Sequence, residues 1–225
     1  MKKTISLLIV LILTAGGCTW SRKIENFENE NSSLRDEIKK QKEENKKLLP
    51  SALSLNEAAS RMKAMEADIK TTAGTITVSF FPEKAPLTCL SFLARAESGF
   101  YEGTVFHRVI PGFMIQGGDP NSKDNNPAND GLGGPAFSIP HEFNNISHAR
   151  GILSMARPAD KKAGAGSQFF IMHANSTHLD GQYTAFGKVM SGMDVADKIA
   201  NSPTGRANRP EEPPVIEEII VRKNN

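Results

Sequence analysis

The chain divides into three stretches that differ in how apolar and polar residues follow one another. Residues 5–13 are predominantly apolar, residues 20–49 are rich in Glu, Lys and Asn, and from residue 68 onward short apolar runs alternate with Gly, Pro and Asn. Short apolar runs bounded by such turn-forming residues are typical of β-strands. The patterns predict a leader, a helical spacer and a β-rich domain.

Lys2 and Lys3 precede the apolar run, and the small residues after it end at Cys18. This order is typical of a secretory signal, and the run is shorter than the about 20 apolar residues that span a bilayer. Gly-Gly-Cys18 resembles the lipobox of bacterial lipoproteins, although Ala15 stands where that family usually has Leu. The resemblance implies a signal peptide over residues 1–17 and acyl chains on Cys18 that hold a membrane. The alternative is an ordinary signal peptide with an incidental cysteine.

The polar stretch after Cys18 carries residues at the alternating three-and-four spacing of an a/d pattern for about four heptads, which predicts a helix. Three of these positions are polar: Asn31, Gln41 and Asn45. We favour a solvated helical spacer of about 40 Å over a weak, self-associating coiled coil. Pro50 ends the helix, and a second helix is expected from Leu55 to about Ala67. Residues 18–66 are therefore assigned to a lipid-anchored helical stalk and linker.

Residues 67–222 are predicted to form one domain. Two β segments flank Gly74, and two helices are expected at 87–98 and 193–199. Many short strands at regular spacing favour a closed or nearly closed sheet whose ends the helices cover. Further strands are expected at 105–110, 113–116, 151–156, 168–172, 184–189 and 215–221.

Composition narrows the function classes. The 27 basic and 25 acidic residues leave a net charge of only +2, so no nucleic-acid partner is expected. Two cysteines are too few for a disulfide scaffold, and Cys89, inside an apolar run, is predicted to be a buried small side chain rather than a reactive thiol. The histidines lack the spacing of zinc ligands. No metal is expected.

One block, Phe106-His-Arg-Val-Ile-Pro-Gly-Phe-Met-Ile-Gln-Gly-Gly-Asp-Pro120, resembles the signature of the cyclophilins. Residues 151–156, 166–171, 179–181 and 186–189 resemble the later blocks of that family, in the same order and spacing. The resemblance covers about Ala67 to Val221. It implies a mainly β fold, a closed eight-stranded antiparallel β-barrel capped by two helices. It also implies peptidyl-prolyl cis-trans isomerase activity without a cofactor.

Rotation about a peptide bond faces a barrier of about 18–20 kcal/mol, set by the double-bond character of the C–N bond. Lowering it requires a donor that bonds the amide best when it is twisted, and no nucleophile or metal. Arg108 has a permanent charge and a rigid fork of donors, and the resemblance implies that it is catalytic together with Phe113 and Gln116. The resemblance further implies that substrate is bound by Met114, Ala156, Arg157, Gln168, Phe170, His178, Leu179 and Tyr183.

Phe113, Met114, Phe170 and Leu179 match positions that line the proline pocket of the family, and Gln116 and Gln168 match positions that orient the substrate and support the arginine. Ala156 and the Arg157 backbone match the segment that pairs with the residue before proline.

Three positions depart from the family. Arg157 replaces a frequent Asn, at a contact made chiefly through the backbone. His178 replaces a Trp of eukaryotic members that binds the inhibitor cyclosporin, so weak cyclosporin sensitivity with retained activity is expected. Tyr183 replaces a His that closes the pocket.

We predict an isomerase of X-Pro bonds in exported proteins, which assists folding in the cell envelope while lipid-anchored to a bacterial membrane and facing the periplasm or the exterior. Its expected partners are proline-containing peptides and unfolded proteins. Two alternatives stay open: a chaperone or scaffold that binds Pro-containing segments with little turnover, and a structural envelope protein whose stalk assembles into a coiled coil.

Overall fold

The computed structural model describes residues 55–124, 126–160 and 164–224, together with Ser32, Asp36 and Lys39, which have helical backbone. The chain forms two compact units, residues 1–53 and 54–225, and the second is considered below. The predicted signal peptide, Cys18 and most of the stalk lie outside the described residues. Within the described part, none of the helices has the length and hydropathy needed to cross a bilayer.

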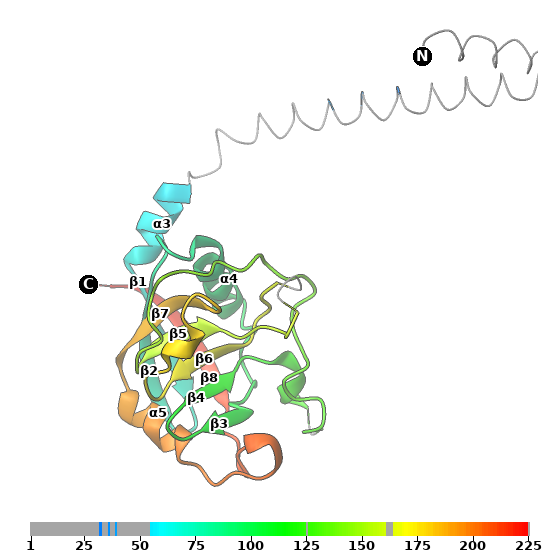
Figure 1. Cartoon of the computed structure of the whole chain (residues 1–225), viewed down its shortest axis with the longest axis vertical. Coiled ribbons are helices and arrows are strands. Elements are labelled where there is room, and N and C mark those ends of the chain that lie inside the picture. The colour runs from blue at the N-terminus through cyan, green and yellow to red at the C-terminus, as the bar shows by residue number, and fades with distance from the viewer. Residues whose placement is uncertain are drawn as a thin grey trace, which may run out of the picture. The chain divides into compact units, whose positions relative to one another are not determined.

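Eight strands and three α-helices make up the second unit (Figure 1). The strands are β1 Met65–Thr71, β2 Gly74–Phe80, β3 Arg108–Ile110, β4 Met114–Gly117, β5 Ile152–Met155, β6 Phe169–Met172, β7 Thr184–Ser191 and β8 Ile216–Lys223. The helices are α3 Leu55–Lys63, α4 Pro86–Glu97 and α5 Met193–Ala200, and short 3-10 turns are η1 Pro120–Lys123, η3 Thr177–Leu179 and η4 Arg206–Asn208.

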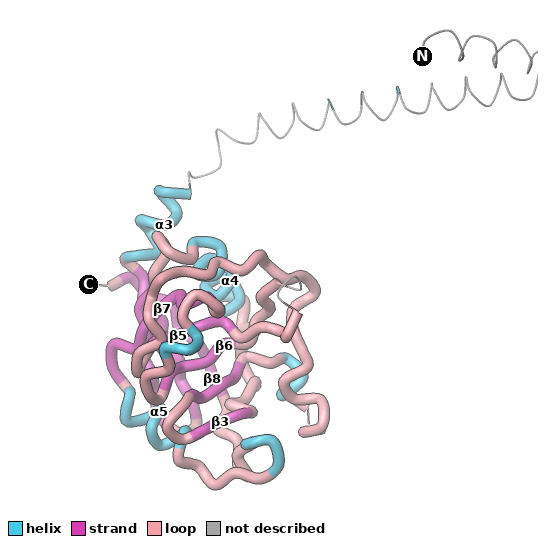
Figure 2. The backbone as a smooth tube through the Cα atoms, viewed as in Figure 1, coloured by secondary structure: helices cyan, strands magenta, loops and turns pink. Residues whose placement is uncertain are grey.

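The strands form one sheet in the order β3-β4-β6-β5-β7-β2-β1-β8, with every neighbouring pair antiparallel. It is a curled half-barrel, and α4 and α5 lie toward its opposite ends (Figure 2). The predicted mainly β fold with eight antiparallel strands is confirmed.

Closure of the barrel differs from the expectation, because β3 and β8 share no ladder in the part of the chain that the structure describes. The irregular segment before β3 bridges them instead: Val105 pairs with Val215, and Ile216 N donates to Thr104 O at 2.7 Å.

The two helices predicted to cover the sheet are α4 and α5. The expected helix from Leu55 to about Ala67 is wrong at its end, because α3 stops at Lys63 and Met65 begins β1. This strand pairs with both β2 and β8, and Ala67 and Ile69 are fully buried. Tertiary pairing therefore overrides the local helical pattern.

Helix α4 anchors the main core. Phe92 packs against Phe169 and Phe186, with ring centroids 5.4 Å away in each case. Cys89 is fully buried and its thiol donates to the Phe186 carbonyl at 3.4 Å. Burial raises the pKa of Cys89 to about 12, which confirms the prediction of an unreactive, packed side chain.

Candidate functional site

Strands β4 and β6 send alternate side chains to opposite faces, as the two-residue period of a strand requires. Ile115, Phe169 and Ile171 belong to the main core, whereas Met114 and Phe170 belong to a second, smaller apolar cluster. Met114 lies opposite Met172 in the register, and Gln116 lies opposite Phe170. The second face therefore carries apolar residues beside polar ones.

The apolar cluster brings together all four residues predicted to line a proline pocket. Met114, Phe170 and Leu179 are buried in it, and Phe113 packs against them while partly exposed. Met172 joins them. Ile110, Ile152, Ala156 and Tyr183 also pack against the cluster. Its partly exposed edge offers an apolar surface for a small ring.

Arg108 stands next to this cluster at the start of β3. It pairs across the strands with Gln116, and its Nη1 donates to Gln116 Oε1 at 3.5 Å, a weak hydrogen bond. Gln116 Nε2 donates to Gln168 Oε1 at 3.0 Å, and Gln168 Nε2 donates to the Gly133 carbonyl at 2.8 Å. The two predicted glutamines thus form an amide chain that runs from a backbone carbonyl to the guanidinium.

The guanidinium of Arg108 is only partly buried. Among residues 55–124, 126–160 and 164–224, no carboxylate lies within ion-pair distance of it. Its donors therefore remain available to a ligand, apart from the weak bond to Gln116.

Two hollows meet at Gln116. One, of about 780 Å³, is lined by His107 and Arg108 among others, and the other, of about 460 Å³, is lined by Gln168, Ala156 and Arg157 among others. Gln116 lines both of them. Together they form a groove, which we call the Arg108 groove.

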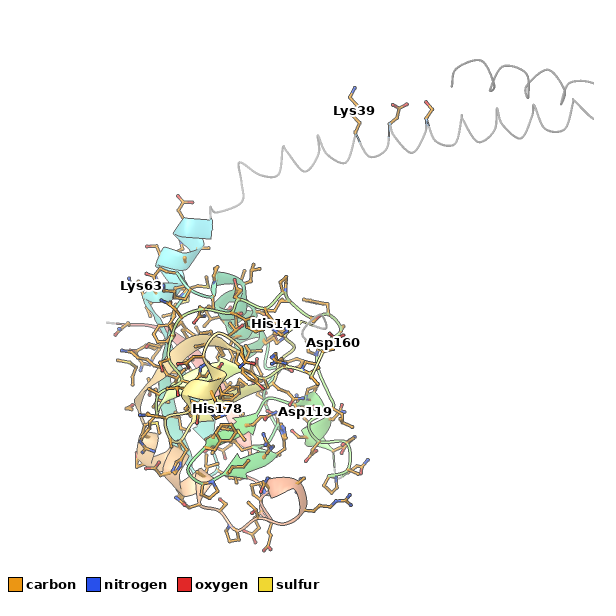
Figure 3. The ribbon with its side chains drawn as sticks, in the orientation of Figure 1. Lys39, Lys63, Asp119, His141, Asp160 and His178 are labelled. Atoms are coloured by element: carbon orange, nitrogen blue, oxygen red, sulfur yellow. The ribbon has the colours of Figure 1, made fainter. Side chains whose placement is uncertain are left out.

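A tight loop, residues 131–134, forms one wall of this groove. Its anchor is Asp119, which is fully buried and accepts hydrogen bonds from the backbone N–H groups of Gly131 and Gly133. A Cβ atom at Gly133 would overlap the Asp119 carboxylate, so glycine is required there. Asp119 itself lies in the segment after β4 (Figure 3). The exposed His178, also labelled there, belongs to η3.

Of the three positions that depart from the family resemblance, Arg157 lines the Arg108 groove, whereas His178 and Tyr183 lie at the apolar cluster. His178 stacks on Phe113, with ring centroids 5.9 Å apart, and Tyr183 meets Phe170 edge-on at 5.7 Å. The Arg157 guanidinium lies 4.6 Å above the Tyr183 ring, and its Nε donates to the Gln182 carbonyl at 2.9 Å. The Arg157 side chain is thus occupied. Ala156 N donates to the Gln168 carbonyl at 2.9 Å.

A polar network behind the apolar cluster was not singled out from the sequence. His148 is 1% exposed, and its Nδ1 lies 3.0 Å from Asp180 Oδ1 and its Nε2 3.1 Å from Ser154 Oγ. Burial lowers the pKa of His148, although Asp180 opposes this effect. The one signal of this network in the sequence is Asp180, which lies within the block of residues 179–181.

No group of three or more His, Cys, Asp or Glu suited to a metal ion occurs within the described ranges. His107, the residue before Arg108, is buried, and burial lowers its pKa. What the site presents is a cation, an amide chain and an apolar surface, which together suit binding of a polypeptide.

Comparison with family models gives a match over residues 66–221 to the family described as cyclophilin type peptidyl-prolyl cis-trans isomerase/CLD. "Peptidyl-prolyl cis-trans isomerase B" of Bacillus subtilis is 46% identical over 128 residues, which are 56% of this chain and 83% of that protein. "Peptidyl-prolyl cis-trans isomerase-like 2" of Rhizopus delemar is 42% identical over 162 residues, 70% of this chain but only 29% of that longer protein.

Solved structures agree with the sequence matches. A cyclophilin-type peptidyl-prolyl cis-trans isomerase of Cryptosporidium parvum, determined in the presence of the dipeptide Ala-Pro, has a TM-score of 0.63 and 34% identity. The match covers 71% of this chain and 99% of that one.

Proposed function

The chain belongs to the cyclophilin-type peptidyl-prolyl cis-trans isomerases, and we propose that its Arg108 groove accelerates X-Pro rotation in proteins exported from the cytoplasm. The isomerase class follows from the family. The observation that supports the assignment of this groove is the Arg108 guanidinium, which forms no ion pair with the described residues and is aligned by Gln116 beside an apolar cluster.

The chemical step needs no bond to be broken. As the prolyl amide twists, its nitrogen loses conjugation with the carbonyl and becomes a better acceptor. The Arg108 guanidinium then donates to the twisted amide more strongly than to either planar isomer, so the transition state is bound in preference to substrate and product. Its charge is permanent, so this step requires no proton transfer.

The apolar cluster holds the ring while the carbonyl side rotates. Phe113, Met114, Phe170 and Leu179 supply a surface for the pyrrolidine, and contact with it costs little because these side chains are already ordered by packing. The amide chain from Gly133 through Gln168 to Gln116 fixes the direction of the Arg108 fork. Gln116 and Gln168 are therefore positioning residues in this proposal, and both also line the groove.

A comparison of wild type with Arg108→Ala tests this role against the alternative of a binding module. The assay follows isomerisation of a short X-Pro peptide by exchange NMR with the purified full chain. We expect turnover by the wild type and its loss in the variant, whereas peptide binding without turnover in either protein would favour the binding module.

The cellular setting is supported by the leader alone. Residues 1–17 have the order of a secretory signal, and Cys18 follows the small residues at its end. In our proposal acyl chains on Cys18 tether the protein to a membrane of the cell envelope, and the residues between Cys18 and the second unit, which begins at Ser54, form a stalk that holds the domain away from it. The proteins met there fold after export, when slow prolyl isomerisation limits folding.

Mass spectrometry of the mature N-terminus tests the anchor. The proposal requires a chain that starts at Cys18 and carries acyl mass, whereas a chain that starts elsewhere without lipid contradicts it. Sedimentation of the full chain distinguishes the two hypotheses for the stalk. A helical spacer predicts a monomer, and a self-associating coiled coil predicts an oligomer.

A further inference from the structure

A second groove lies outside the site described above, along the outer face of α4. It has a volume of about 500 Å³ and is lined by apolar side chains that include Leu87, Leu90, Ala94, Phe100, Phe137 and Ile139. We call it the α4 groove. Three of its large side chains are solvent-exposed, Leu87 at 38%, Leu90 at 51% and Phe137 at 70%. Apolar surface gathered in this way is typical of an interaction site.

The two walls of the α4 groove are fixed in place. One wall, α4, has no side-chain cap of its own at Ala85, and Glu142 supplies one: its carboxylate accepts from Thr88 N at 2.8 Å and from Thr88 Oγ1 at 2.7 Å. The facing wall, residues 135–139, is tied at Ile139, which exchanges two backbone hydrogen bonds with Ala165. The groove is therefore formed before any ligand arrives.

The α4 groove is continuous with the Arg108 groove. Pro135 lines both hollows. After it, Ser138 lines the Arg108 groove, whereas Ala136, Phe137 and Ile139 line the α4 groove. A polypeptide that leaves the Arg108 groove past Gln168 and crosses Pro135 reaches the apolar surface of α4.

The chemistry of the α4 groove selects the kind of segment that fits. Its charged lining group is Arg95, whose Nη1 already donates to Ser91 O at 3.2 Å and whose guanidinium lies 5.9 Å from the Phe100 ring centroid. The remaining surface gives apolar contacts without a fixed pattern of donors and acceptors. It suits large apolar side chains of varied sequence, which are exposed in non-native proteins and buried in native ones.

We propose that the α4 groove binds an extended apolar segment of the same non-native polypeptide whose X-Pro bond occupies the Arg108 groove. This inference rests on the proposed function and adds a substrate class to it. Binding at a second point makes occupation of the Arg108 groove effectively intramolecular, so affinity rises without any new contact at the proline. The enzyme then favours prolines in unfolded chains over prolines in short or folded segments.

The test compares two kinds of substrate with the full chain. One is a four-residue X-Pro peptide, and the other carries the same four residues plus a Leu-Phe pair placed 4, 8 or 12 Gly/Ser residues away on either side. The variant is Leu90→Ser/Phe137→Ser, two exposed positions outside the Arg108 groove. The matched control is Met190→Ser, because Met190 is as exposed as Leu90, at 51%, but lies on β7 outside this groove.

We expect kcat/KM of at least one long peptide to exceed that of the short peptide by about tenfold. This gain should disappear in the double variant, because its KM for the long peptide rises to that for the short one. It should persist in Met190→Ser. The short peptide should be turned over equally by all three proteins. Absence of any gain, or equal loss in Met190→Ser, overturns the inference while leaving the proposed function intact, whereas failure of wild type on the short peptide removes the proposed function itself.

A second copy of the chain is the competing occupant. Sedimentation of wild type and the double variant at increasing concentration decides between them. A dimer that forms in wild type and is lost in the double variant would assign the α4 groove to self-association and overturn the inference, whereas equal sedimentation of the two proteins supports it.

Discussion

The imidazole of His148 stacks on the ring of Phe170, with centroids 6.1 Å apart and planes inclined by 23°. Both ring nitrogens of His148 are held, one by Asp180 and the other by Ser154. The position of Phe170, a wall of the proposed proline seat, thus depends on a polar network on its far side.

Replacement His148→Phe should keep a stacked ring but remove both hydrogen bonds. Phe170 then loses a fixed neighbour, and because small misplacements at a site lower the rate steeply, we expect kcat/KM to fall about tenfold, mainly through KM. His148→Gln, which can still bond Asp180, should recover part of the loss. Wild-type KM in His148→Phe, measured by exchange NMR, would show that the network has no positioning role.

Stability should decrease in mild acid. Burial lowers the pKa of both His107 and His148 below the usual 6.5, against weaker opposing effects of nearby aspartates. The folded state therefore favours the neutral rings, and the stabilisation is complete above pH 6.5 and is lost as the pH falls below it, when the unfolded chain takes up protons. We expect the urea midpoint to fall between pH 7 and pH 5.

The double variant His107→Asn/His148→Asn is the matched control for this pH dependence. It should be less stable at pH 7 but should show a smaller change between pH 7 and pH 5. An unchanged pH dependence in the variant would assign the acid sensitivity to other groups.

Inhibition by cyclosporin should be weak, because His178 stands where the family resemblance places the Trp that binds this inhibitor. The exposed His178 ring offers less apolar area beside Phe113 than an indole would. His178→Trp should strengthen inhibition about tenfold while peptide turnover stays within a factor of about two. A wild-type chain as sensitive as Trp-containing relatives would contradict this expectation in an inhibition titration.

Breaking the amide chain at Gln168 tests whether this chain positions the Arg108 guanidinium. Gln168→Met keeps the length of the side chain but leaves the Gly133 carbonyl and the Gln116 amide without their present partner. We expect the free energy of unfolding to drop by about 1–3 kcal/mol, and kcat/KM to drop about tenfold because the guanidinium is less well directed. Full activity in a stable Gln168→Met protein would remove the amide chain from the mechanism.

The strands could be predicted because their signals are local, whereas the pocket residues were predicted from the resemblance of contiguous motifs to those of the cyclophilins. Alternation in β4 and β6 separates Met114 and Phe170 from Ile115 and Phe169, and the motif around Arg108 is contiguous in sequence. Chemistry that depends on neighbouring positions of one strand is visible from the sequence.

The features that were missed depend on distant segments. His148, Ser154 and Asp180 come from three parts of the chain and meet only after β5 and η3 are in place. The start of β1 at Met65 is set by pairing with β8, which is adjacent to β1 in the sheet but is the last strand in the sequence. Glu142 caps α4 from more than fifty residues away in the sequence, so no local sequence pattern predicts this cap.

The rate of prolyl isomerisation by the full chain, compared between wild type and Arg108→Ala, is the decisive test of catalysis at the Arg108 groove. We expect a folded variant, with an unchanged urea midpoint, whose kcat/KM is lower by about 10²–10³ because a transition-state donor is lost. A variant that isomerises the X-Pro peptide as fast as wild type would contradict the role of the guanidinium.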